Sequence, residues 1–557
     1  MPAGDEGELK KDMQARLGVL SSEQEERLAR QRAESLGLAY ISLYAYPTDA
    51  DVLELIPRTL AQQASAVLFY RQGQDVRIGA VNPGLPEFAK FVAQVKQTIG
   101  SPPQVYIISH RSLAAALSRY RREEHVVAIP QNEMRVAGKS LSEFEATIND
   151  LRALGQHIAT LPPTEVLTTV VSGAVKLGAS DIHIEPKEKE ARLRYRIDGV
   201  LQDITSFELA GWKLLLSRVK VLSKLKLNVH ATPQDGSFVL RVDKKTYDMR
   251  VSILPGGDGE NIVVRLLDRE SEAVRLTDLG MKERDYQVIR DELKKSNGMI
   301  LTTGPTGSGK TTTLASFVSE MNSPELKIIT LEDPIEYRLP GVEQTQIDAD
   351  AGYTFAKGLR AILRQDPDVI LVGEMRDAET AETAMHAALT GHLVFSTLHT
   401  NDAPGAIPRL IDMGIKPFII APAVNAVIAQ RLVRIVCAKC AQEYRPDQTT
   451  RQKIKEVMRG LLPVLFNPRV LDDPALTFKK AIGCAHCANT GYKGRKGLFE
   501  IFVVSGEVEE LVLQAASGNA IRAAAQRAGM TTIAQDGYLK VIAQITTVEE
   551  IERTTSE

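Results

Sequence analysis

The chain has 557 residues, of which 44% are hydrophobic and 25% are charged, and its formal net charge is −2. This length exceeds what one hydrophobic core supports, and a soft prior of about 150 residues per domain predicts three or four units. The balanced charge and ordinary composition exclude a strongly basic nucleic-acid binder and indicate a soluble globular protein.

The N-terminal residues are charged where a signal peptide needs an apolar run, so we expect no signal peptide. No stretch reaches the ~18 uninterrupted apolar residues of a membrane-spanning helix. The nearest, residues 418–429, is short and contains Pro422 and Asn425, which predicts a buried helix. Together these features favour a cytosolic protein.

Residues 1–130 form the first predicted unit. Leucines 17, 20, 28 and 36 show modest helical periodicity, and residues 66–69 form a short strand-like run. We expect this unit to be an N-terminal docking or regulatory domain. The polar residues 131–148 have neither the helical nor the strand period, which predicts a linker.

The second predicted unit spans residues 149–268. Residues 181–185 and 192–197 alternate with a period of two, and Asp198-Gly199 then provides a tight hairpin turn. A helix is expected over residues 213–226. The pattern predicts a small antiparallel sheet with helices, followed by a linker at 269–277.

The third predicted unit, residues 278–557, alternates strands and helices. Four short apolar runs, each followed by room for a crossover helix, predict a parallel sheet buried on both faces; they are residues 299–302, 328–331, 369–372 and 393–396. Reactive residue types follow each run, and ligands collect at the carboxyl ends of such strands. We therefore expect the clusters to form one site.

The first cluster is a full match to the phosphate-binding loop pattern, placed between a strand and a helix. Glycines let the loop turn its N–H groups inward, Lys310 supplies a charge for the β- and γ-phosphates, and Thr311 offers a hydroxyl to Mg²⁺. The expected nucleotide-binding residues are Gly304, Pro305, Thr306, Gly307, Ser308, Gly309, Lys310, Thr311 and Thr312.

Carboxylates follow the next two runs. Glu332 and Asp333 can position water or Mg²⁺, although Asp333 before Pro334 also suits a turn or helix cap. Glu374 follows the run 369–372, where a phosphate-loop ATPase needs an acidic residue to polarise the attacking water. Glu374 is therefore the expected general base, with a solvated loop glutamate as the alternative.

Two histidines flank the fourth run. His399 follows it and can hydrogen-bond the γ-phosphate or Glu374, whereas His392 precedes it. Either can instead be a structural histidine that bonds the backbone.

Arginines commonly meet the charge that develops on a transferred phosphoryl group. Arg360 and Arg364 have the spacing of one helix face. Arg192, Arg194 and Arg196 share one face of their strand, which can equally be a solvated sheet face.

The four cysteines form two Cys-x-x-Cys pairs whose spacing suits a closed, structural Zn²⁺ site with four thiolates. Free thiols or redox pairs are the alternative. The expected ligands are Cys437, Cys440, Cys484 and Cys487. The long segment between the pairs has to loop out and return.

In combination, these motifs resemble the secretion ATPases of type II secretion and type IV pilus extension. The resemblance covers roughly residues 150–545 and includes GPTGSGKTTT at 304–313, TLEDPIEY at 330–337, LRQDPDVILVGEMRD at 363–377 and TGHLVFSTLHTNDA at 390–403. Further matches are SDIHIEP at 180–186, RYRIDGVL at 194–201, PQDG at 233–236 and GMTTIAQDG at 529–537.

The resemblance implies an α/β fold with a RecA-like P-loop core, preceded by a small α+β, PAS-like domain and an N-terminal α/β docking domain. It implies a cytoplasmic homohexamer at the inner face of the membrane that hydrolyses MgATP and contains structural Zn²⁺. It also implies two partners, a membrane platform protein and a cytoplasmic adaptor. Glu374 would be the catalytic carboxylate with Glu332 assisting, and Arg194 and Arg196 would contact nucleotide at domain or subunit boundaries.

The chain departs from similar proteins at two places. Ser237 follows PQDG, where a basic residue is usual. Residues 16–18, Arg-Leu-Gly, resemble the opening of a cyclic-di-GMP-binding domain, but the continuation is shortened, which leaves that ligand unassigned.

Two other functions remain as alternatives to a motor ATPase. A nucleic-acid translocase predicts a basic patch interleaved with aromatic residues, which the sequence lacks. A nucleotide-binding regulator without turnover is disfavoured by the presence of both Lys310 and Glu374.

Overall fold

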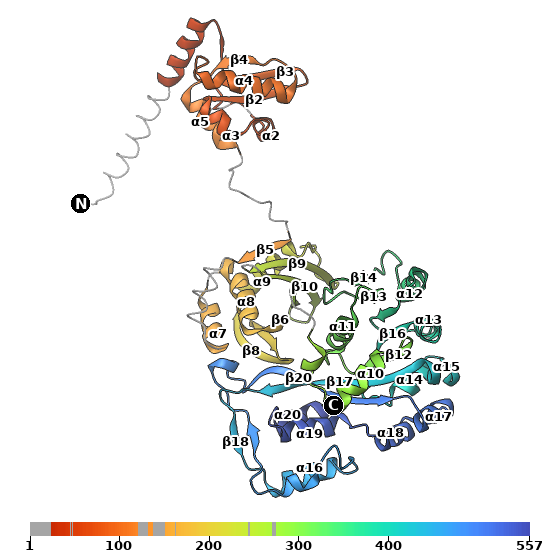
Figure 1. The fold of residues 1–557 in the computed structure, drawn as a ribbon. Coiled ribbons are helices and arrows are strands. Elements are labelled where there is room, and N and C mark those ends of the chain that lie inside the picture. The colour runs from red at the N-terminus through yellow and green to blue at the C-terminus, as the bar shows by residue number, and fades with distance from the viewer. Residues whose placement is uncertain are drawn as a thin grey trace, which may run out of the picture. The chain divides into compact units, whose positions relative to one another are not determined.

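The computed structural model describes residues 24–44, 46, 48–120, 132–136, 151–161, 163–242, 245–269 and 274–556. The chain divides into two compact units, Met1–Ile129 and Pro130–Glu557 (Figure 1). The predicted features at Leu17, Leu20 and residues 16–18 lie outside the described residues.

The first unit contains a four-stranded sheet in the order β1-β4-β3-β2. Phe69 and Phe91 are among the large side chains of its core. The strand-like run at 66–69 is confirmed as the start of β2. The strands are β1 Ala39–Tyr40, β2 Ala66–Gln72, β3 Asp75–Ala80 and β4 Gln104–Ile107, and the helices are α2 Ala50–Leu53, α3 Arg58–Gln63, α4 Pro86–Ile99 and α5 His110–Arg119.

A helix over residues 24–36 precedes this sheet, but its buried face is not the one that the leucines predicted. Leu28 and Leu36 are exposed, whereas Ala29 and Ala33 are buried against Ile107. Small side chains allow the helix backbone to approach the sheet closely, so alanine occupies the contact.

The second unit begins with a seven-stranded sheet in the order β5-β9-β10-β11-β6-β7-β8. All neighbouring strands are antiparallel except β5 and β9. The elements are β5 Glu133–Val136, β6 Ala179–Pro186, β7 Glu190–Ile197, β8 Val200–Glu208, β9 Gln234–Val242, β10 Lys245–Pro255, β11 Glu260–Asp268, α7 Leu151–Thr160, α8 Pro163–Leu177 and α9 Leu209–Leu222.

The predicted hairpin turn is confirmed between β7 and β8. Ile197 pairs with Val200, and the two residues between them have positive φ angles, 48° at Asp198 and 85° at Gly199. Two positive φ values suit the primed turns that match strand twist. The helix predicted at 213–226 is present as α9, displaced toward the N-terminus.

The first predicted linker, 131–148, contains strand β5. Glu133 is 7% exposed and its carboxylate pairs with Arg135 and Arg241, at 2.7 and 2.9 Å. These ion pairs let a polar segment join the sheet, which period-based reasoning does not detect. In the second predicted linker, 269–277, Leu276 is 2% exposed and packs in the hydrophobic core of the third predicted unit.

A second seven-stranded sheet forms the centre of the remaining chain, in the order β14-β13-β15-β16-β12-β17-β20. Its neighbours are parallel except for β17 and β20. The four apolar runs are confirmed as strands. The members are β12 Gly298–Thr303, β13 Ile328–Glu332, β14 Glu343–Gln346, β15 Val369–Val372, β16 Leu393–Leu398, β17 Val424–Val436 and β20 Tyr492–Val503.

Helices cover both faces of this sheet, as expected for buried parallel strands (Figure 1). They are α10 Glu283–Leu293, α11 Lys310–Met321, α12 Phe355–Ile362, α13 Ala378–Leu389, α14 Ala406–Asp412, α15 Pro417–Ala423, α17 Glu507–Leu513, α18 Gly518–Arg527, α19 Ile533–Ile542 and α20 Val548–Thr555.

The helix predicted at 418–429 is wrong over its second half. Helix α15 ends at Ala423, and β17 begins at Val424 and pairs with β12. Pro422 lies near the helix end, and the β-branched residues Val424, Val427 and Ile428 fit a fully buried strand. The mostly apolar segment could not reveal where the helix ends and the strand begins.

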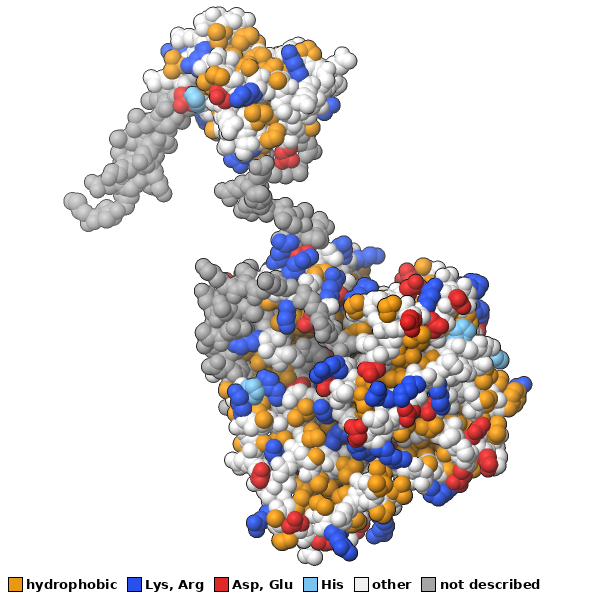
Figure 2. Space-filling model, viewed as in Figure 1, with side chains coloured by type: hydrophobic (Ala, Val, Ile, Leu, Met, Phe, Trp, Pro, Cys, Tyr) orange, Lys and Arg blue, Asp and Glu red, His pale blue; other side chains and the backbone are white. Residues whose placement is uncertain are grey.

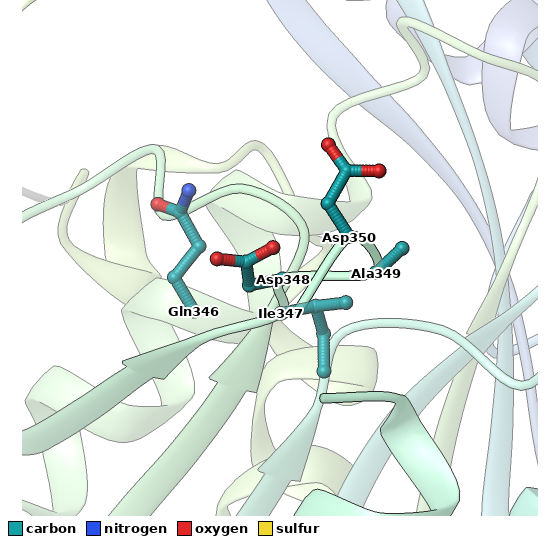
Figure 3. Close-up of a pocket in the computed structure, with 5 residues that line it drawn as sticks. All are labelled: Gln346, Ile347, Asp348, Ala349 and Asp350. Carbon is teal, nitrogen blue, oxygen red and sulfur yellow. The ribbon is translucent and has the colours of Figure 1, made fainter. Parts of the chain in front are cut away.

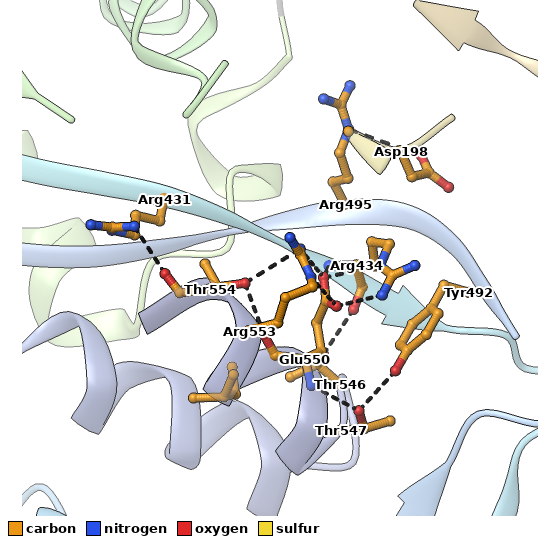
Figure 4. Close-up of polar contacts among 12 residues, drawn as sticks. Asp198, Arg431, Arg434, Tyr492, Arg495, Thr546, Thr547, Glu550, Arg553 and Thr554 are labelled. Carbon is orange, nitrogen blue, oxygen red and sulfur yellow. Dashed lines mark hydrogen bonds and ion pairs between the residues drawn. The ribbon is translucent and has the colours of Figure 1, made fainter. Parts of the chain in front are cut away.

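Helix α20 is fastened to β17 by a buried carboxylate (Figure 4). Glu550 accepts hydrogen bonds from the guanidinium groups of Arg434 and Arg553, with closest contacts of 2.6 and 2.7 Å. Although burial opposes it, these arginines hold the pKa of Glu550 down at about 2. The carboxylate therefore stays ionised and secures the C-terminal helix to the central sheet.

Within the described residues, no helix is both long and apolar enough to cross a membrane. Acidic and basic side chains are interspersed over the face of residues 130–557 that Figure 2 shows.

Candidate functional site

The carboxyl ends of four neighbouring strands meet at one edge of the central sheet. β13, β15, β16 and β12 lie side by side in parallel register, so the residues that follow them share that edge. Gly373 shows how close the strand ends lie, since a Cβ on it would be 3.4 Å from the Cα of Glu332.

The loop after β12 has the backbone that its glycines predict. Gly304, Gly307 and Gly309 have φ angles of 142°, 79° and 91°, a region that favours glycine. Lys310 begins α11, so the loop lies at a helix N-terminus, which suits an anion. The hydroxyl of Ser308 is buried and has no hydrogen-bond partner among the described residues.

These features fit a bound phosphate. A glycine-rich loop at a helix N-terminus, with an unpartnered buried hydroxyl, provides hydrogen-bond donors of the kind that phosphate oxygens accept. The ammonium of Lys310 folds back onto the loop and donates to the carbonyl oxygens of Gly304 and Pro305, at 2.7 and 3.2 Å. A phosphate could take over these bonds.

Lys310 and Glu374 follow the carboxyl ends of β12 and β15, at the same edge of the central sheet. Burial lowers the pKa of Lys310, and the negative charge of Glu374 acts in the opposite direction. The Glu374 side chain is 14% exposed, and its oxygens lie 2.8 Å from Nε of Arg376 and 3.5 Å from Nε2 of His399. The structure thus places the expected base, His399 and the phosphate loop together.

The two histidines have different surroundings. His399 follows β16 and is half exposed beside Glu374. His392 precedes β16, at the opposite edge of the sheet, and its Nδ1 lies 3.0 Å from the carbonyl oxygen of Ala387. His392 is therefore placed as a structural histidine, which was one of its two expected roles.

Glu332 is more enclosed than Glu374. It is 7% exposed, and its Oε1 accepts from the Thr330 hydroxyl at 2.7 Å and the Gln344 amide at 3.0 Å. Burial raises the pKa of Glu332. The carboxylates at adjacent strand ends thus have different electrostatic surroundings.

The arginines of β7 form ion pairs within their own sheet. Arg194 pairs with Glu185, and Arg196 lies 3.4 Å from Asp181. Arg192 pairs with Asp203. In this single chain, these described contacts join strands of the same domain. Arg360 pairs with Glu379, and Arg364 donates to the carbonyl oxygen of Arg360.

Arg250 was missed by the sequence analysis. It lies on β10, where it pairs with Ser237, and its guanidinium donates to the carbonyl oxygen of Ile335 at 3.2 Å. Burial lowers the pKa of Arg250, while the nearby Glu336 raises it. Arg250 thus places a positive charge at the loop after β13, next to Ser237 in the sheet. This position follows from the register of the sheet and not from any local sequence pattern.

A hollow lies beyond the end of β14 (Figure 3). Its lining comes from one short segment, and Figure 3 shows the side chains of Gln346, Asp348 and Asp350 pointing to the same side of it. None of the lining residues belongs to the phosphate loop. The hollow is therefore distinct from the nucleotide-binding residues predicted above.

The four cysteines converge at the end of β17 and the approach to β20. Their sulfur atoms all lie within 4.8 Å of one another, and three pairs are 3.8 or 3.9 Å apart. Four sulfurs at about 2.3 Å from a tetrahedral Zn²⁺ would be about 3.8 Å apart, whereas a disulfide needs about 2.05 Å. The cluster has the dimensions of a metal site.

Backbone donors support thiolates in this cluster. The N–H groups of Gly483 and Gly491 lie 3.3 and 3.2 Å from the sulfurs of Cys440 and Cys487. Between the two pairs, the chain forms β18 Gln442–Tyr444, α16 Gln448–Val457 and β19 Phe478–Lys480. β18 and β19 pair antiparallel, which returns the chain to the second cysteine pair.

The parallel sheet, the loop at the start of α11 and the carboxylates at adjacent strand ends define a P-loop ATPase. A model of the type II/IV secretion system protein family matches residues 159–553, and an MshEN domain model matches residues 36–127. The chain belongs to the type II/IV secretion system protein family, and it is an ATPase of that family.

The chain is similar to two curated relatives over most of their length. It is 45% identical to Type II secretion system protein E of Pseudomonas aeruginosa over 398 residues, covering 71% of this chain and 76% of the relative. It is 34% identical to the type IV pilus assembly ATPase PilB of Myxococcus xanthus over 533 residues, covering 95% and 91%.

A solved structure shares the fold. The ATPase DotB of Legionella pneumophila aligns with a TM-score of 0.50 at 23% identity, covering 71% of this chain and 95% of DotB.

Proposed function

We propose that this ATPase is a cytoplasmic motor that assembles a type IV pilus or a type II secretion pseudopilus. The observation that supports the enzymatic part is that the phosphate loop and Glu374 follow two parallel strands, β12 and β15, at the same edge of one sheet. The relatives PilB and protein E, named for pilus assembly and for secretion, support the cellular role.

In the proposed reaction, residues 304–312 hold the triphosphate and Lys310 neutralises the β- and γ-phosphates. Thr311 would hold Mg²⁺, which neutralises charge on the phosphates. Glu374 accepts the proton of the attacking water. His399 and Arg376 fix the Glu374 carboxylate through the contacts described above, and Glu332 assists from the adjacent strand.

The proposed assembly is a homohexamer at the inner face of the membrane. Arg194 and Arg196 would reach the nucleotide of a neighbouring subunit after leaving their present carboxylate partners. The motion of the second domain would pass through the N-terminal unit to a platform protein and its cytoplasmic adaptor. Zn²⁺ held by the four cysteines would be structural, because four thiolates leave no open position.

The variant Glu374→Gln tests the assignment of the base. It should lower phosphate release by at least about 100-fold while ATP binding persists, because the amide keeps the shape but cannot take a proton. Glu382→Gln, an exposed change on α13, is the matched control and should retain full turnover. Unchanged turnover in Glu374→Gln would show that another group is the base.

The cellular role needs a separate measurement. A host strain whose own copy carries Glu374→Gln should lose either surface pili or the secretion of folded proteins. If both persist while purified protein has lost turnover, the motor proposal is wrong although the enzymatic assignment stands.

A further inference from the structure

Gln430 lies directly behind the phosphate-binding loop. Strand β17 runs parallel to β12, with Thr303 paired to Ala429, so Gln430 stands beside the point where β12 becomes the loop. Its side chain is 2% exposed. A buried amide at such a position needs hydrogen-bond partners.

The side chain of Gln430 bonds the first turn of α11. Its Oε1 accepts a hydrogen bond from the hydroxyl of Thr313 at 2.7 Å, and Thr313 is itself fully buried. Thr313 lies three residues after Lys310. The bond therefore ties β17 to the helix turn that carries the lysine.

Gln430 also touches both ends of the loop. A Cβ added to Gly304 would lie 2.4 Å from the backbone oxygen of Gln430, and one added to Gly309 would lie 2.9 Å from Nε2 of its side chain. The backbone and the amide of one residue thus form the surface against which the loop turns. The two outer glycines of the loop allow this close approach.

The strand behind Gln430 is itself held in place. The next residue, Arg431, donates to the carbonyl oxygen of Thr554 at 2.9 Å, and Arg434 bonds the Glu550 carboxylate. β17 is paired on both edges, with β12 and β20. Gln430 is therefore presented from a fixed strand, whereas the loop that it contacts is free of strand pairing.

We propose that Gln430 is a positioning residue that holds the phosphate-binding loop in the conformation that receives nucleotide. This inference rests on the nucleotide site of the proposed function. Gln430 acts through the loop, with its amide fixing Thr313 and its backbone limiting Gly304. Without the amide, the loop can adopt conformations that do not bind phosphate. The apparent affinity for nucleotide then falls in proportion to the fraction of molecules whose loop is in the binding conformation.

The variant Gln430→Met tests this, since methionine preserves length and burial but removes the amide. We expect Kd for a fluorescent ATP analogue to rise about three- to tenfold, the range of one hydrogen bond. Gln535→Met is the matched control. Gln535 is 4% exposed on α19, and its hydrogen-bond partners among the described residues include Thr532 and Val457, neither of which belongs to the loop. It should lower the melting temperature without changing Kd.

Thr313→Val removes the other half of the same bond with little change of shape. If the bond positions the loop, Gln430→Met and Thr313→Val should each weaken binding, and the loss in the double variant should be clearly smaller than the sum of the two single losses, because both changes remove the same bond. Additive losses, or an unchanged Kd in Gln430→Met, would overturn the positioning role.

The outcomes separate this inference from the function on which it rests. Lys310→Ala should abolish binding of the ATP analogue, whatever the role of Gln430. If the unaltered protein does not bind the analogue, both proposals fail. If it binds, and Gln430→Met matches Gln535→Met in both Kd and melting temperature, only the positioning role fails.

Discussion

Glu332 and Glu374 are carboxylates at adjacent strand ends with different surroundings. Glu374 contacts Arg376 and His399, whereas Glu332 is enclosed and accepts from the uncharged side chains of Thr330 and Gln344. Divergent surroundings commonly assign different roles to paired carboxylates. This difference supports the proposal that Glu374 activates the attacking water and that Glu332 assists it.

The raised pKa of Glu332 predicts a pH-dependent gain from Glu332→Gln. A carboxyl whose folded-state pKa lies above its unfolded value of about 4.5 destabilises the fold increasingly as pH rises through that value. The variant should therefore melt at a higher temperature than the unaltered protein at pH 7.5, with the gap closing toward pH 4.5. Thermal melts across this range provide the measurement, and a gap that widens on acidification would contradict the prediction.

The sequence alone predicted the position of those candidate residues that directly follow a strand. The phosphate loop, Glu374 and His399 each follow an apolar strand, so parallel pairing alone brings them to one edge. Arg250 and Gln430 carry no such local signal. Their positions depend on register, Arg250 opposite Ser237 and Gln430 one residue beyond the pairing of Ala429, and register is set by the whole sheet.

At the scale of elements, β17 connects the candidate nucleotide site with the cysteine cluster. It starts beside the phosphate strand, carries Gln430 behind the loop, and ends directly before Cys437. It pairs with β20 from Ala426 to Val436, and β20 begins five residues after Cys487. The sequence analysis missed the start of this strand and predicted a helix at 418–429. A strand buried on both faces lacks the period-two pattern that marks half-exposed strands.

The cysteine cluster closes the end of this β17–β20 pair, which predicts the effect of Cys484→Ser. The N–H of Cys437 already donates to the carbonyl oxygen of Gly491 at 2.9 Å, so a bound metal would lock that junction. We expect bound zinc to fall from about one per chain to a small fraction, with lower melting temperature. Elemental analysis of purified protein measures the first effect.

His486→Ala is the control for this prediction. His486 is exposed in the same knuckle, and four thiolates leave it no position in the metal shell. It should retain the full zinc content. Unchanged zinc in Cys484→Ser, or loss in His486→Ala, would contradict a four-cysteine site.

At the scale of the whole molecule, the small antiparallel domain touches the ATPase core within one chain at two described places. Arg250 reaches the loop after β13, and the hairpin residue Asp198 accepts from the N–H of Gly494 at 3.0 Å. Arg495 lies 3.9 Å from the same carboxylate (Figure 4). One contact lies on the loop after β13 and the other on the chain that follows the second cysteine pair, so a movement of this domain would change contacts near both sites.

In a motor, contacts between the second domain and the ATPase core have to break during the cycle. The variant Asp198→Ala tests whether the hydrogen bond from Gly494 to Asp198 is formed in the protein without nucleotide. Loss of the acceptor should accelerate hydrogen exchange of the Gly494 amide by about tenfold or more, since tenfold is the lower end of the range for one hydrogen bond to a charged group. Asp203→Ala, which removes a carboxylate paired with Arg192 on the same hairpin, should leave Gly494 unchanged. Equal exchange at Gly494 with and without Asp198 would mean that the hairpin does not rest on its own core. In that case the domain is free to engage a neighbouring subunit without first breaking this contact.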